Sequence, residues 1–252
     1  MAETITPWTE TFRVRSYEVE PSGRASVETL CHYFETAASG HAQALGFSIE
    51  HLVERNLTWV LSRLHLSIDA LPRWRDEVRL TTWPSGQNGL FATREFLLHD
   101  AADRLLARAT SGWVTIDLAR RRPMRLPAFF RALSFPDRPR ALDDAFPRLR
   151  PPDVDAFERR FRVRYGDLDL NGHVNNVQYV AWAVETMPPP FIEAHRLADL
   201  QIHLRAETHY DDLVLARAGT EDAETGVFWH RLCREADGRE VAVARTQWVA
   251  DD

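Results

Sequence analysis

Four polar side chains gather at alternating positions in one short stretch of the sequence. They are two carboxylates, an amide and an imidazole: Asp167, Asp169, Asn171 and His173. An imidazole can move a proton near neutral pH, and a neighbouring carboxylate can orient it. An amide N–H can donate to an oxygen that becomes negative during a reaction. These residue types together indicate acid–base chemistry at a group that develops an oxyanion.

The neighbouring residues predict the elements that position these side chains. Residues 161–165 alternate between apolar and polar types, which predicts a strand, and residues 166–172 are rich in Gly, Asp and Asn, which predicts a turn. A helix is expected over residues 175–186, capped by Asn175 or Asn176. Because turns of this composition often precede helices, the turn alone is typical of a structural loop.

Composition and charge narrow the class of protein. The 252 residues are 44% hydrophobic and 27% charged, which is typical of a soluble globular chain with one large domain or two small ones. A net charge of −6 argues against nucleic acid as the main partner. The sequence shows neither a targeting signal nor an apolar stretch long enough for a bilayer, so we expect no membrane association. Two distant cysteines, Cys31 and Cys233, favour a reducing compartment, and the expected location is cytoplasmic.

The two halves of the chain repeat one pattern. Residues 12–25, FRVRSYEVEPSGRA, align with residues 161–174, FRVRYGDLDLNGHV, at an offset of 149 residues. After a gap of a few residues, the similarity continues, and residues 88–96 align with residues 225–233. A repeat of this length indicates one structural unit that occurs twice.

Each unit is expected to contain a first strand, one helix and then several long strands. The helices are expected over 26–45 and 175–186, and the later strands over 57–69, 75–84, 89–99 and 105–118 in the first unit and over 200–209, 212–219, 226–234 and 240–249 in the second. Pro188 to Pro190 should end the second helix because proline lacks the N–H that continues it. One helix against an antiparallel sheet is an α+β arrangement. The resulting domains are 1–118 and 159–252, joined by a connector over 119–158 that is rich in Pro and Arg.

Only one copy carries the polar set. Opposite its four members, the first copy has Glu18, Glu20, Ser22 and Arg24. The first copy therefore keeps the scaffold and lacks the amide and the imidazole. We expect the second half to hold the reacting groups and the first half to shape a substrate pocket.

The segment YGDLDLNGHVNNVQY, residues 165–179, closely resembles the signature of the plant-type acyl-acyl-carrier-protein thioesterases and their bacterial relatives. The resemblance covers nearly the whole chain, including residues 56–78 in the first half and residues 204–215, LRAETHYDDLVL, in the second. It implies a tandem hot-dog fold, in which each antiparallel sheet wraps around a central helix.

The resemblance also implies site residues. Asp169, Asn171 and His173 fall on the family's catalytic loop, and Glu207 falls on its catalytic glutamate. The family often has a cysteine directly after that glutamate, whereas this chain has Thr208, so a cysteine nucleophile is not expected. Glu207 would activate water or, as the alternative, attack the thioester directly. His173, oriented by Asp169, would move the proton, while Asn171 and backbone N–H groups at the helix start would stabilise the oxyanion.

The implied activity is hydrolysis of fatty acyl thioesters on acyl carrier protein, which releases free fatty acid and ends chain elongation. Two alternatives remain open, namely an acyl-CoA thioesterase of the hot-dog type and a non-catalytic acyl-binding module. No cofactor or metal ion is expected. A homodimer is a further expectation.

The connector is a candidate docking surface for an acidic carrier protein, because it is rich in arginine. Seven arginines and one acid lie between residues 120 and 140, and the expected docking residues are Arg120, Arg121, Arg122 and Arg125. The same arginines would also suit the phosphates of CoA, or a solvated connector without a partner.

Overall fold

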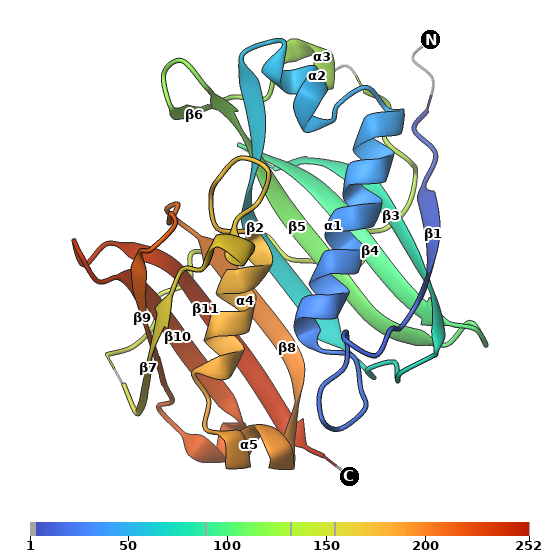
Figure 1. The fold of residues 1–252 in the computed structure, drawn as a ribbon. Coiled ribbons are helices and arrows are strands. Elements are labelled where there is room, and N and C mark those ends of the chain that lie inside the picture. The colour runs from blue at the N-terminus through green and yellow to red at the C-terminus, as the bar shows by residue number, and fades with distance from the viewer. Residues whose placement is uncertain (1–3, 89, 132, 154, 252) are drawn as a thin grey trace. The chain divides into compact units, whose positions relative to one another are not determined.

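Each half of the chain builds an antiparallel sheet against one long helix, as the computed structural model shows (Figure 1). The structure describes residues 4–88, 90–131, 133–153 and 155–251. It divides into two units, Met1–Phe146 and Pro147–Asp252, and the division falls inside the region that the sequence indicated as a connector. Among the described residues, no helix is long and apolar enough to cross a membrane.

The first unit contains six strands and three helices among its described residues. They are β1 (Trp8–Arg13), α1 (Val27–Ala44), α2 (Ile49–Val53), β2 (Leu57–Ile68), β3 (Glu77–Asn88), β4 (Phe91–Asp100), β5 (Leu105–Asp117), β6 (Arg122–Met124) and α3 (Ala128–Arg131). The sheet order is β1–β3–β4–β5–β2, and β6 pairs with the last residues of β5. The helix α1 packs against β1 and β3. Ser26 caps α1 by accepting the N–H of Thr29 at 3.2 Å.

The second unit repeats this architecture. Its elements are β7 (Phe157–Arg162), a 3-10 turn (Tyr165–Asp167), α4 (Asn176–Glu185), α5 (Pro189–Ala194), β8 (His195–Leu204), β9 (Leu213–Gly219), a second 3-10 turn (Ala223–Thr225), β10 (Val227–Arg234) and β11 (Glu240–Ala250). The sheet order is β7–β9–β10–β11–β8, which matches the first unit strand for strand. The helix α4 packs on β8, β9 and β10.

The predicted repeat is confirmed at the level of the backbone. β7 begins and ends 149 residues after β1, and α4 begins 149 residues after α1. Both sheets are antiparallel and each has a helix on one face, so the α+β class and the tandem arrangement are confirmed. The start predicted at residue 89 for one strand lies outside the described residues, and β4 begins at Phe91.

Proline does more than end α4. The helix ends at Glu185, one residue before the predicted end, and Pro189 and Pro190 then occupy the first positions of α5. Proline suits the first helical turn because its fixed φ is helical and the N–H that it lacks would have no partner there. A short helix therefore follows where the sequence indicated only an interruption.

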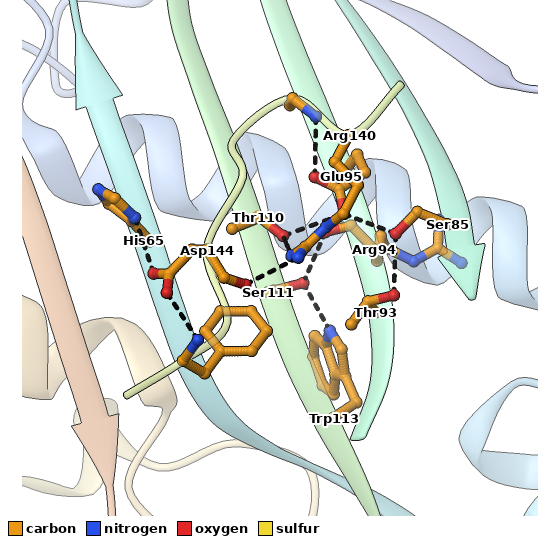
Figure 2. A network of polar contacts seen from close by, with 12 residues as sticks. His65, Ser85, Thr93, Arg94, Glu95, Thr110, Ser111, Trp113, Arg140 and Asp144 are labelled. Atoms are coloured by element: carbon orange, nitrogen blue, oxygen red, sulfur yellow. Dashed lines mark hydrogen bonds and ion pairs between the residues drawn. The ribbon is translucent and has the colours of Figure 1, made fainter. Parts of the chain in front are cut away.

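Near the end of the first unit, Arg140 forms an ion pair with the buried Glu95 on β4 (Figure 2). Glu95 on β4 is fully buried, and its carboxylate accepts Arg140 Nε at 3.1 Å. Ser85 and Thr110 donate to the same carboxylate at 2.6 and 3.0 Å, and the backbone N–H of Ala141 donates to it at 3.0 Å. A buried charge is tolerated only when paired and hydrogen-bonded, and this carboxylate is both. The half-buried residues 140 and 141 are therefore bound to the buried carboxylate of β4.

Candidate active site

The predicted polar stretch forms a closed loop between β7 and α4. After the 3-10 turn the chain folds back, so that Leu168 and Val174 pair with each other. Gly172 lies in the turn with a φ of 74°, in the left-handed region, which glycine adopts without a steric penalty. The loop thus has a defined backbone shape before any side chain is considered.

Asp167 and Asn175 join the loop to the start of α4. The buried Asp167 carboxylate accepts the backbone N–H and the guanidinium of Arg164, each at 2.7 Å. Its carbonyl accepts the N–H of Asn175 at 2.9 Å, and the Asn175 side chain accepts the N–H of Val177 at 2.8 Å. Asn175 is therefore the cap. Its N–H, which we expected to face an oxyanion, is already used inside the loop.

Asp169 organises the exposed part of the loop. Its Oδ1 accepts the backbone N–H groups of Asn171 at 2.8 Å and of His173 at 3.2 Å, and its Oδ2 lies 3.3 Å from the Asn171 amide nitrogen. From the sequence we expected this carboxylate to orient the His173 ring. In the structure it holds the backbone of His173 instead, because the loop turns the peptide N–H groups toward it.

Glu207 approaches His173 from a distant segment. His173 Nε2 lies 3.4 Å from Glu207 Oε2, and the two side chains are 31% and 44% exposed. Both groups therefore reach each other and solvent, as an acid–base pair that uses water requires. Glu207 lies beyond the end of β8 at Leu204, not within the strand that was predicted to reach residue 209.

Thr208 fixes the segment that carries Glu207. Its side chain is buried between the exposed Glu207 and His209, and its carbonyl accepts the N–H of Val174 at 3.1 Å. The N–H of Thr208 donates to the phenol oxygen of Tyr179 at 3.1 Å, and Thr208 Oγ1 lies 2.8 Å from that oxygen. Burial raises the pKa of Tyr179, which keeps the phenol protonated. Glu207 is thereby tied to both the loop and α4.

His209 is a neighbour that the sequence reading missed. Its ring centroid lies 5.2 Å from that of His173, at an interplanar angle of 77°. Residues two apart on an extended chain point to the same side, so the spacing of Glu207 and His209 was the available signal. One ligand atom from each of His173, Glu207 and His209 lies within 4.8 Å of the other two, which makes the trio a candidate metal-binding group.

The first half repeats the loop with different chemistry. Gly23 has a φ of 76°, and its N–H donates to Glu20 as the N–H of Gly172 donates to Asp169, at 2.8 and 3.0 Å. The N–H of Ala25 donates to the carbonyl of Pro72 at 2.8 Å. This last bond is the counterpart of the one between Val174 and Thr208.

That correspondence identifies the remaining counterparts. Pro72 takes the place of Thr208, so Leu71 stands where the second half has Glu207, and Arg73 stands where it has His209. The N–H of Arg73 donates to Asp76 at 2.8 Å, as the N–H of His209 donates to Asp212 at 2.8 Å. The first loop therefore keeps the backbone and replaces the carboxylate by an apolar side chain.

Neither cysteine belongs to this arrangement. Cys31 lies on α1 and Cys233 on β10, and burial raises the pKa of both thiols. Because the thiolate is the nucleophilic form, a raised pKa makes a thiol less reactive. Both thiols are therefore less suited to act as nucleophiles than an unburied cysteine.

Comparison with known families places this geometry in context. The acyl-ACP thioesterase N-terminal domain matches residues 6–133, and the acyl-ACP thioesterase C-terminal domain matches residues 151–250. The chain belongs to the acyl-ACP thioesterase family. This confirms the resemblance seen in the sequence.

Relatives of this thioesterase-family chain include plant proteins. The chloroplastic acyl-[acyl-carrier-protein] hydrolase FATB1 of Cuphea viscosissima is 30% identical over 252 residues, which cover 94% of this chain and 60% of that protein. The chloroplastic oleoyl-acyl carrier protein thioesterase 1 of Arabidopsis thaliana is 29% identical over 272 residues, covering 95% of this chain and 75% of that protein. This chain thus spans about 60% of the length of the first relative.

A solved structure of the family has the same fold. The 12:0-ACP thioesterase from Umbellularia californica superimposes with a TM-score of 0.87 at 28% identity, covering 97% of this chain and 98% of that one. The double hot-dog fold that the sequence resemblance implied is confirmed.

Proposed function

We propose that this chain hydrolyses fatty acyl thioesters on acyl carrier protein and releases the free fatty acid. The observation that carries the proposal is the 3.4 Å approach of His173 Nε2 to Glu207 Oε2 in a member of the acyl-ACP thioesterase family. Three similar proteins are named for acyl-carrier-protein hydrolysis, which supports the substrate class.

The chemistry assigns one role to each side chain. Glu207, with His173 as its proton relay, takes a proton from a water molecule while the water oxygen bonds to the thioester carbonyl carbon. The carbonyl oxygen becomes negative and accepts an N–H of the Asn171 amide, one of whose two donors remains after its contact with Asp169. The intermediate then collapses, the carbon–sulfur bond breaks, and the relayed proton neutralises the departing thiolate. Asp169 maintains the loop throughout.

The turnover of variants at Glu207, His173 and Thr208 tests these roles. Glu207→Ala and His173→Ala should each lower kcat by roughly 10²–10⁴-fold with the fold intact, since each removes a positioned acid–base group. Thr208→Ala should have a much smaller effect, because its backbone bonds to Tyr179 and Val174 persist. Near-normal rates in both of the first variants would refute the assignment. A loss for Thr208→Ala as large as that for Glu207→Ala would mean that the reacting group is misplaced.

The substrate carrier is tested directly. The same long acyl chain is presented on acyl carrier protein and on CoA, and initial rates are compared. A higher kcat/KM with the carrier protein supports the proposal. A preference for CoA would refute the carrier assignment, and no hydrolysis of either across several chain lengths would favour an acyl-binding module.

The basic hairpin between β5 and β6 is our candidate dock for the acidic carrier. Arg120, Arg121, Arg122 and Arg125 are exposed. Arg120 lies 3.7 Å from the partly buried Asp117, and its own side chain is 82% exposed, so its guanidinium remains accessible to a partner's carboxylate.

Other connector arginines are engaged elsewhere. Arg140 pairs with the buried Glu95, and the guanidinium of Arg138 lies 4.4 Å from the ring centroid of Trp83. The side chain of Arg131 lies outside what the structure describes. The dock is therefore restricted to the four hairpin arginines.

Charge reversal tests the dock. Arg122→Glu combined with Arg125→Glu should raise KM for the carrier-bound substrate and weaken its salt dependence, with kcat and the CoA substrate little affected. Arg104→Glu, at an equally exposed arginine paired with Asp100, is the matched control. Equal changes in both proteins would show a general charge effect and rule out this dock. The homodimer and the cytoplasmic location stay predictions.

A further inference from the structure

Three side chains of types that can ligate a metal ion lie close together at the candidate active site. His173 Nε2 and Glu207 Oε2 are 3.4 Å apart, and the ligand atoms of the trio with His209 lie within 4.8 Å of one another. Ligands about 2.0–2.1 Å from a tetrahedral Zn²⁺ are roughly 3.3 Å apart, so the first pair already has the required spacing. His209 is about half exposed, so its ring can rotate to complete the set.

A further carboxylate supports the third ligand. Asp212 Oδ2 accepts the backbone N–H of His209 at 2.8 Å and lies 4.0 Å from the ring Nδ1. Asp212 therefore holds the backbone that carries the third ligand, and its negative charge lies near the His209 ring.

We propose that His173, Glu207 and His209 bind one Zn²⁺ ion per chain, and that the bound ion suppresses hydrolysis. Two imidazoles and a carboxylate are a common donor set for Zn²⁺. The suppression rests on the proposed function, because the ion would take the lone pair of His173 and the carboxylate of Glu207 that water activation needs. The binding itself does not rest on it.

The duplicated loop predicts the stoichiometry. The counterparts of the three ligands in the first half are Arg24, Leu71 and Arg73, none of which can ligate a metal. Among the described residues, the group in the second half is the one cluster of three potential ligands that meets the distance requirement. One ion per chain is therefore expected.

The test measures Zn²⁺ binding by isothermal titration calorimetry at pH 7.5, on protein without a polyhistidine tag. His209→Gln should weaken binding by at least about tenfold, because it removes a ligand. His32→Gln is the matched control, since that histidine is similarly exposed and faces Glu35 at 3.9 Å, and the described part of the chain offers no third ligand there. It should bind Zn²⁺ like the unmodified chain.

Thioester hydrolysis is then measured with and without Zn²⁺ in the same three proteins. We expect Zn²⁺ to slow the unmodified chain and the His32→Gln variant, EDTA to restore the rate, and His209→Gln to resist inhibition. Equal zinc affinity with and without His209 would overturn the site, and a rate increase on adding Zn²⁺ would overturn the suppression. Zinc binding that depends on His209 in a chain without hydrolysis would support the site and refute only the proposed activity.

Discussion

The phenol oxygen of Tyr179 lies 3.1 Å from the backbone nitrogen of Thr208 and 2.8 Å from its hydroxyl oxygen. Both residues are buried, and Thr208 directly follows the proposed water-activating Glu207. One side chain on α4 thereby holds the segment that follows β8, although the two residues are 29 positions apart in the sequence. This contact therefore holds the segment whose Glu207 lies 3.4 Å from His173.

Tyr179→Phe should lower kcat by roughly tenfold with little change in KM, because a small displacement of Glu207 misaligns the attacking water. The loss of one hydrogen bond should also lower the free energy of unfolding by about 1 kcal/mol. Tyr33→Phe is the matched control, since that phenol donates to Glu18 at 2.8 Å in the first unit's loop. If both variants lose stability equally and neither loses activity, Tyr179 has no positioning role.

Asp169 should act through its acceptor oxygens rather than through its charge. Asp169→Asn retains one oxygen for the N–H groups of Asn171 and His173, so activity should fall by less than about tenfold. Asp169→Ala leaves both N–H groups without their acceptor and should reduce kcat by roughly 10²-fold. Steady-state kinetics of the two Asp169 variants distinguishes these roles. Equal, large losses would show that the negative charge itself is required.

Arg140→Met should destabilise the first unit by about 3–5 kcal/mol, because it leaves the Glu95 carboxylate buried without its cation. Thermal and urea unfolding measure the change. Arg79→Met, at the exposed pair with Asp103, is the control and should cost less than about 1 kcal/mol. The double substitution Glu95→Leu with Arg140→Met should recover stability, and its failure to do so would assign the loss to packing rather than to charge.

Two buried histidines should make the protein sensitive to acid. Burial, with the nearby charge of Arg94, lowers the pKa of His41 to about 4, and burial lowers the pKa of His230 to about 3. In an unfolded chain, histidine has a pKa of about 6.5. The unfolded state therefore takes up protons first as the pH falls through 6.5, and folded stability is lost between that value and the folded pKa.

The expected size is about 1 kcal/mol per histidine between pH 7 and pH 5.5. Urea unfolding at the two pH values measures it. His230→Gln should show a smaller drop than the unmodified chain, whereas His32→Gln, at an exposed position, should show the same drop. An unchanged drop in His230→Gln would contradict the assignment.

Much of the fold follows from local pattern. Both long helices begin and end within about one residue of expectation. The strand expected over 161–165 is wrong in position: β7 spans Phe157–Arg162, beginning within the predicted connector, and Tyr165 lies in the 3-10 turn. Apolar periodicity and turn residues reflect local structure, so they located the two long helices well, whereas the ends of β7 and β8 differ from expectation by several residues. They also located the loop of Asp169, Asn171 and His173, because the N–H groups that the Asp169 side chain accepts come from residues at most four positions away.

Other features depend on contacts between distant residues. Local pattern does not bring Glu207 to His173; only the family resemblance indicated it. The Tyr179 contact with Thr208 spans 29 positions, and the pairing of Arg140 with Glu95 spans 45. Such pairs are set by how the sheet and the loops pack. An arginine of the predicted connector, Arg140, therefore pairs with a buried carboxylate, which the local sequence does not indicate.

The shared turn at Gly23 and Gly172 bears on how the two halves tolerate mutation. Each turn requires a left-handed residue, so any other residue at either position carries a similar conformational penalty. Under the proposed function, the side chains around Gly172 contribute to turnover, whereas their counterparts around Gly23 lack the amide and the imidazole. Sequence drift should therefore accumulate at Ser22 and Arg24 faster than at Asn171 and His173, while the two glycines persist alike.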